Sequence, residues 1–318
     1  MSFIRTVLGD IDAESMGITY SHEHIIIEES LPTSNNPLFL LNDVEKVSLE
    51  LKKVYELGGR TMVDTMPSDC GRNINKLAEV SKRTEINIIA PTGIHLEIYY
   101  PSDHWRYQYS EEKLTQMFVD DISIGIDQYD YHGPLVKRTS HKAGMIKLAT
   151  GDDKITAHQE KIFRAVVNAH QITGAPILTH TNYGRRAMDQ VELFSKLGAN
   201  LSHIVLSHVD RYKDVHYNRE LLQTGVKVEY DSAFRWPVKD VNWTYKLLEE
   251  LLEEFPNQIT VGMDAAKSSY WTSYRGHPGL GFLLTTFIIK LEEMGLSEYF
   301  TNLFIKNPAA IFSFQNVN

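Results

Sequence analysis

The stretch TYSHEHIII, residues 19–27, places a histidine on each side of a glutamate and runs directly into three isoleucines. Side chains of an extended strand alternate between its two faces, so His22 and His24 share one face and Glu23 points to the other. Neutral imidazole is a common metal ligand and also an ordinary polar side chain at the end of a strand. The stretch therefore predicts a strand that ends in two histidines, and it leaves metal binding and structural hydrogen bonding both open.

Short apolar runs rich in β-branched residues, like the one at the start of this stretch, recur along the chain. They span residues 17–24, 60–65, 86–94, 144–149, 176–181, 203–209, 226–231 and 259–265. A closed α/β barrel needs eight strands, and the chain offers eight candidates.

Segments between several of these runs have helical periodicity. In residues 157–174 an apolar stripe precedes a closing glycine, and residues 242–256 alternate paired leucines with paired glutamates before a proline. The stripe consists of Ile162, Phe163, Val166, Ala169 and Ile172. Strands that alternate with helices indicate parallel strands joined by crossover helices. The sequence predicts one (β/α)8 TIM-type barrel domain over residues 1–318, with a doubly wound open sheet as the alternative.

Composition restricts the class of protein. The chain is 42% hydrophobic with a formal net charge of −9, which argues against a nucleic-acid partner because phosphate backbones need a clustered basic face. The N-terminus lacks an apolar core of signal-peptide length, and the apolar run 279–291 is too short to span a bilayer. We expect a cytoplasmic protein without a membrane partner, a core helix over 279–291, and a buried thiol at Cys70, the single cysteine.

Side chains able to bind metal end several of the predicted strands. They are His22 and His24 on the first strand, Lys147 on the fourth, His180 on the fifth, His208 on the sixth and Asp264 on the eighth. The C-terminal ends of barrel strands meet at one rim, where barrel enzymes carry their active sites. Their common position favours one shared site over unrelated structural roles.

These residues belong to motifs that follow one another at barrel spacing: SHEH at 21–24, GMIKLAT at 144–150, ILTHT at 177–181, VLSHVD at 205–210 and VGMDAA at 261–266. In this respect the chain resembles, over essentially its whole length, the phosphotriesterase-like family of the amidohydrolase superfamily. The resemblance implies two divalent metal ions, one held by His22, His24 and Asp264 and the other by His180 and His208. It also implies that Lys147 is carboxylated and bridges the two ions, and that the protein is a homodimer.

The resemblance further implies hydrolysis of an ester-like bond by a metal-bridging hydroxide, with Asp264 carrying the proton to the leaving oxygen. Zinc suits imidazole and carboxylate ligands, and manganese, cobalt and iron are the alternatives. Glu23, on the opposite strand face, is expected to support the site rather than to act as the catalytic acid.

The loops after the predicted strands select the substrate. Arg235 follows the seventh strand, and Lys267, Tyr270 and Arg275 follow the eighth. Arginine and lysine together suit an anionic group such as phosphate, whereas a long acyl chain requires an apolar channel. The aromatic loop after the third strand offers His95, Glu97, Tyr99 and Trp105, either as a pocket wall or as packing residues, and His95 stands where some relatives carry tyrosine.

We therefore predict a metal-dependent lactonase whose small-molecule substrate is an anionic, phosphorylated sugar lactone. The alternatives are a phosphotriesterase, an acyl-homoserine lactonase and a catalytically silent barrel that binds a metabolite. Histidines away from the predicted strand ends are expected to be structural or surface groups; they are His104, His132, His141, His158, His170, His203, His216 and His277.

Overall fold

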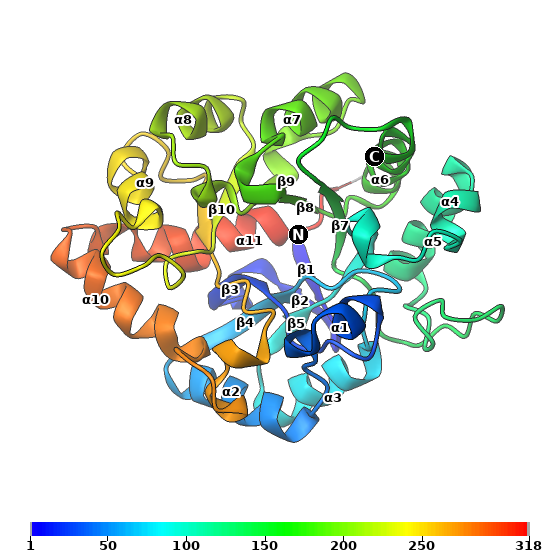
Figure 1. Cartoon of the computed structure of the whole chain (residues 1–318), viewed down its shortest axis with the longest axis horizontal. Coiled ribbons are helices and arrows are strands. Elements are labelled where there is room, and N and C mark those ends of the chain that lie inside the picture. The colour runs from blue at the N-terminus through cyan, green and yellow to red at the C-terminus, as the bar shows by residue number, and fades with distance from the viewer. Residues whose placement is uncertain (1, 317–318) are drawn as a thin grey trace.

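The computed structural model describes residues 2–316 and contains a ring of parallel strands surrounded by helices (Figure 1). Two parallel sheets build the ring, with strand orders β3-β4-β5 and β6-β7-β8-β9-β10-β11. Their bounds are β3 (Ile18–Glu23), β4 (Gly59–Asp64), β5 (Asn87–Ile89), β6 (Pro91–Gly93), β7 (Met145–Thr150), β8 (Ile177–Thr181), β9 (Ile204–Ser207), β10 (Lys227–Tyr230) and β11 (Ile259–Val261). Each of the eight predicted strands is present.

The two sheets join at both of their edges. β5 and β6 are separated only by Ala90, and the first pairs with β4 while the second pairs with β7. On the other side, the N–H groups of Met263 and Asp264 donate to the His22 carbonyl at 3.2 and 3.0 Å. No regular ladder links β11 to β3 within residues 2–316, so these two bonds close the ring. The predicted barrel is confirmed, and the open-sheet alternative is wrong.

Helices follow most of the strands and cover the outside of the ring (Figure 1). The longer ones are α2 (Val44–Glu56), α3 (Ile74–Thr84), α5 (Glu111–Ser123), α6 (Ala157–Thr173), α7 (Ala187–Lys196), α8 (Val215–Gln223), α9 (Trp243–Leu251) and α10 (Thr286–Glu293). In α6 the Thr156 side chain accepts from the Gln159 N–H, and Gly174 ends the helix with φ 72°. These are the start and stop signals by which a sequence limits a helix.

Two expectations about helices are wrong. Ile172 of the predicted stripe is 57% exposed, because the buried face of α6 turns toward Ala165 and Val167 instead. The run 279–291 is not one core helix: it breaks at Thr285, with φ −126° and ψ −88°, into a 3₁₀ segment and α10. Only part of this run is buried.

The N-terminal ends of the barrel strands are covered by elements that the sequence analysis did not predict. β1 (Phe3–Thr6) and β2 (Gly9–Asp12) form an antiparallel hairpin, and α11 (Asn307–Phe312) lies near it. Their apolar side chains share a core with residues of several barrel strands; the cluster contains Ile4, Met16, Val63, Ile89, Met145, Leu178, Val205, Ile311 and Phe312. No helix in the described part of the chain is long and apolar enough to cross a membrane.

Candidate functional site

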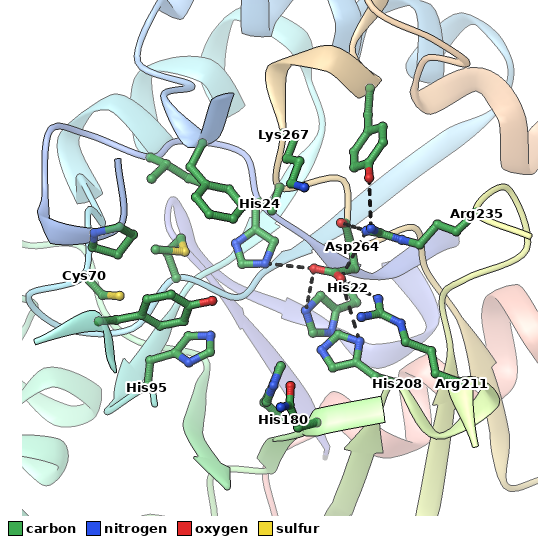
Figure 2. A pocket seen from close by; sticks show the side chains of 18 of the residues that line it. His22, His24, Cys70, His95, His180, His208, Arg211, Arg235, Asp264 and Lys267 are labelled. Atoms are coloured by element: carbon green, nitrogen blue, oxygen red, sulfur yellow. Dashed lines mark hydrogen bonds and ion pairs between the residues drawn. The ribbon is translucent and has the colours of Figure 1, made fainter. Parts of the chain in front are cut away.

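The predicted histidines and Asp264 meet at the C-terminal rim of the barrel (Figure 2). The ring centroids of His22 and His24 are 5.6 Å apart, those of His22 and His208 are 4.8 Å apart, and those of His208 and His180 are 4.6 Å apart. One donor atom each from His22, His24 and Asp264 lies within 4.8 Å of the others. These side chains line a cavity of about 290 Å³.

The backbone at two of these positions has an unusual conformation. His208 directly follows β9 with φ 65°, and Asp264 follows β11 by three residues with φ 49°. Positive φ is strained for residues with a Cβ and is retained where the surroundings require it, often at functional sites. The Glu23 carboxylate supports the second position by accepting from the N–H groups of Met263 and Ala265 at 3.0 and 3.3 Å.

Two buried carboxylates orient the histidines. Glu229 Oε2 lies 2.7 Å from His22 Nδ1, and Asp231 Oδ2 lies 2.6 Å from His208 Nδ1. A carboxylate at Nδ1 holds the proton there and leaves Nε2 as the atom able to bind a metal. Glu229 and Asp231 are two residues apart at the end of β10 and therefore share its inward face. The sequence analysis missed both, although their alternation in the run 226–231 was a usable signal.

Replacing Asp231 with asparagine is expected to weaken divalent-metal affinity by about 10–100-fold, the usual effect of losing a partner that orients a ligand. The reason is that the amide no longer fixes the His208 proton on Nδ1 by charge. Titration against a chelating indicator measures this affinity. The matched control is Asp240→Asn, an exposed position in the loop after the same strand. Equal affinity in the two variants would mean that Asp231 only fills space beside His208.

Lys147 is fully buried and lies close enough to His22, His180 and His208 to influence the pKa of each. It is the third residue of β7 rather than the last, so the prediction that it ends its strand is wrong. Gly93 on β6 pairs with it, and a Cβ at Gly93 would lie 1.9 Å from the Lys147 carbonyl oxygen. Only glycine, here with φ 110°, allows this close approach. Burial lowers the pKa of the Lys147 amine to about 8, despite nearby Glu229 and Asp264.

Several buried polar atoms at the site lack a hydrogen-bond partner among residues 2–316: Lys147 Nζ, His24 Nδ1 and His180 Nε2 are three of them. Buried polar atoms are normally paired, so such a group points to a bound species. Burial also lowers the pKa of His22, His180 and His208 and keeps their imidazoles neutral, the form that binds metal. This donor set fits divalent ions.

Asp264 lies between histidines and arginines. Its Oδ1 is 3.1 Å from His24 Nε2, and its Oδ2 is 2.6 Å from Arg211 Nη2 and 3.1 Å from Arg235 Nη2. Burial alone would raise the pKa of Asp264, but Arg235, His208 and Arg211 hold it well below its usual range. Asp264 is therefore an anion. Arg211, missed by the sequence analysis, directly follows the motif at 205–210 and also pairs with Asp231 at 3.0 Å.

The predicted substrate residues divide into two groups. Lining the cavity are Arg235, Lys267, Tyr270, Tyr99 and His95, together with Arg211. Arg235 Nη1 donates to the Tyr270 hydroxyl at 3.3 Å, and the Leu96 N–H donates to His95 Nδ1 at 2.7 Å, which leaves the proton of neutral His95 on Nε2. The cavity also has apolar lining residues, which include Ile27, Pro32, Phe39, Met66 and the buried Cys70.

Three candidates lie elsewhere. Arg275 is exposed at the end of a 3₁₀ turn with φ 67° and does not line the cavity. Glu97 pairs with Arg106 at 3.4 Å, and the Trp105 indole donates to Asp69 at 2.9 Å. None of these three residues lines the cavity, and the contacts of Glu97 and Trp105 fit the packing alternative. A substrate contact for Arg275 stays a prediction.

Similar proteins cover the whole chain. The model of the Phosphotriesterase family matches residues 2–312. A phospho-furanose lactonase from Mycoplasmopsis agalactiae is 32% identical over 98% of this chain and 92% of that protein. The crystal structure of an amidohydrolase from Mycoplasma synoviae has a TM-score of 0.93 at 30% identity, covering 100% of this chain and 93% of that one. A lactonase from Listeria monocytogenes has a TM-score of 0.90 at 30% identity, covering 99% and 100%.

Proposed function

The chain belongs to the phosphotriesterase family and is a hydrolytic enzyme, and from this premise we propose that it opens the ring of a phosphorylated sugar lactone. The observation that carries the proposal is the cationic wall of the cavity, where Arg235, Lys267 and Tyr270 line the same space as the histidines and Asp264. A relative named phospho-furanose lactonase at 32% identity supports the same substrate class.

We infer the metal ligands from the donor chemistry of the site, from the unpartnered atoms of His24, His180 and Lys147, and from the family to which the chain belongs. One divalent ion would be held by His22, His24 and Asp264, and the other by His180 and His208. Lys147, carboxylated to a carbamate, would be a ligand of both ions. A buried amine with a pKa of about 8 is neutral often enough to react with carbon dioxide. When bound, the ions lower the pKa of a water molecule and polarise the carbonyl oxygen of the substrate.

Residues of the chain transfer the proton and bind the phosphate of the substrate. The Asp264 carboxylate accepts the proton of the attacking water and returns it to the ring oxygen as the carbon–oxygen bond breaks. Arg211 and Arg235, both bonded to Oδ2, keep this carboxylate oriented while it does so. The phosphate of the substrate would lie at Lys267 and Tyr270, and His95 would donate from Nε2 to the sugar.

Replacing Lys267 with alanine is expected to raise KM for a phosphorylated lactone by about tenfold or more, and to leave an unphosphorylated lactone within about twofold, because an ion contact to phosphate contributes at least 1.4 kcal/mol. Steady-state kinetics with five-carbon sugar lactones, with and without a terminal phosphate, measures the difference. Lys239→Ala, an exposed lysine in the loop after β10, is the matched control. Equal losses on both lactones would refute the phosphate contact.

The alternative functions can be distinguished by measuring the turnover of their substrates with one purified sample. Wild-type enzyme is expected to turn over the sugar lactone phosphate faster than an aryl phosphotriester or an acyl-homoserine lactone. A preference for either of the others would reassign the substrate, and a chain that binds no divalent ion after purification without chelator would point to a silent binding protein. Zinc as the metal, a cytoplasmic location and a homodimer are parts of the same proposal.

A further inference from the structure

The loop after β11 carries Lys267 and Tyr270 and then turns back toward α2. It forms 3₁₀ turns at Ser268–Tyr270 and Thr272–Tyr274. Backbone hydrogen bonds join the outgoing arm of the loop, residues 267–270, to its returning arm, residues 272–280. The Gly279 N–H donates to the Tyr270 carbonyl at 2.9 Å, and the His277 N–H donates to the Ser269 carbonyl at 2.8 Å. The position of the returning arm therefore determines where Lys267 and Tyr270 lie.

One carboxylate on α2 holds the returning arm. Glu50 is 1% exposed and does not line the cavity. Its Oε2 accepts from Thr272 Oγ1 at 2.7 Å and from the Ser273 N–H at 2.8 Å, and its Oε1 accepts from the Leu280 N–H at 3.0 Å. Burial by itself would raise the pKa of Glu50, but these hydrogen bonds and Lys53 lower it below its ordinary value. The group is a buried anion bonded to both ends of segment 272–280.

The fit around this carboxylate is close. Gly279 has φ 85°, and a Cβ there would lie 2.9 Å from Glu50 Oε1. The Lys53 ammonium donates to Thr272 Oγ1 at 2.9 Å, so the same hydroxyl is bonded to α2 twice. Hydrogen bonds to a buried charged group are stronger than neutral ones, and a loop bonded in this way keeps one conformation.

We propose that Glu50 is a positioning residue for the anionic end of the substrate: acting through this loop, it places Lys267 and Tyr270 and so sets the affinity for phosphorylated lactones. The inference rests on the proposed function. Asp264, in contrast, is held by other contacts. Its N–H donates to the His22 carbonyl, and the N–H groups of the residues on either side of it donate to Glu23. Its carboxylate accepts from Arg211 and Arg235. Loss of Glu50 should therefore move the phosphate end of the cavity and leave the reacting end in place.

The test is a set of kinetic measurements on the metal-loaded enzyme. Glu50→Ala is expected to raise KM for the phosphorylated lactone about tenfold, the factor that corresponds to one displaced ion contact, with kcat changed less than about twofold. The unphosphorylated lactone and the bound metal content should be unchanged. Thr272→Val removes the hydroxyl that is bonded to Glu50 and Lys53, and it keeps the Glu50 side chain. It is expected to shift KM in the same direction, so the proposal is testable even where Glu50→Ala fails to fold. Glu45→Ala, an exposed glutamate on the same helix, is the control.

A double-mutant cycle separates positioning from a general loss of stability. In a Lys267→Ala background, Glu50→Ala should add little to KM, because the contact that it positions is already gone. Independent, additive effects, or equal losses on both lactones, would overturn the proposal. Should the wild-type enzyme hydrolyse neither lactone, the proposed function fails. In that case, calorimetry compares the binding of inorganic phosphate to the wild type and to Glu50→Ala. Weaker binding to the variant supports the positioning role of Glu50, and equal binding overturns it.

Discussion

Replacing Lys147 with methionine is expected to lower kcat/KM by at least about 10³-fold, because bound metal ions supply several kcal/mol at the transition state and each 1.4 kcal/mol is about tenfold. Lys147 lies on β7 and its side chain is fully buried. Because methionine keeps much of this aliphatic volume, the fold should persist. What is lost is the one side chain that we propose as a ligand shared by the two ions. Elemental analysis should find fewer than two metal ions per chain.

Two further measurements make this prediction specific to the carbamate. Carbon-13 NMR after exposure to labelled bicarbonate should show a carbamate signal in the wild type that is missing from Lys147→Met. In Lys147→Ala, a short carboxylate such as acetate should restore part of the activity, since it supplies two oxygens in the vacated space. Lys154→Met, an exposed lysine in the loop after the same strand, is the control. Full metal content and activity in Lys147→Met would refute the bridging role.

The barrel was predictable because its determinants are local. Each strand is a short apolar run, and α6 has its capping residues and its final glycine within the segment itself. The hairpin β1-β2 was missed because its strands have only four residues each and β2 has no buried residue, so the hairpin gives little periodic signal. The break at Thr285 was missed because the run 279–291 is mostly apolar and its division depends on contacts outside it.

The site shows the same division between local and distant determinants. His22 and His24 could be recognised because strand alternation places them on one face. Alternation also places Glu229 and Asp231 on one face, but it does not reveal the partner of Glu229, since His22 is 207 residues away in sequence and only the folded ring brings them together. Arg211 is similar: its ion pair with Asp264 spans 53 residues. Glu23, which lies between the two histidines, was therefore predicted as a supporting residue, whereas Glu229, Asp231 and Arg211, which approach from other parts of the chain, were not.

Replacing Asp264 with asparagine is expected to lower kcat for a lactone by about 10²–10⁴-fold, the contribution of a positioned general acid-base. The amide keeps the size of the carboxylate but cannot accept and return a proton. Its NH2 group also cannot take the place of Oδ2, where Arg211 and Arg235 both donate. The fold, measured by circular dichroism, should be unchanged.

The identity of the leaving group distinguishes proton delivery by Asp264 from a role in metal binding alone. The ring oxygen of a lactone leaves as a basic alkoxide and needs a proton, whereas an aryl ester with a weakly basic phenolate leaves without one. Asp264→Asn should therefore lose much more activity on the lactone than on the aryl ester when both are measured at full metal occupancy. Equal losses on the two substrates would mean that Asp264 acts through the metal site alone, because a disturbed metal site slows both reactions regardless of the leaving group.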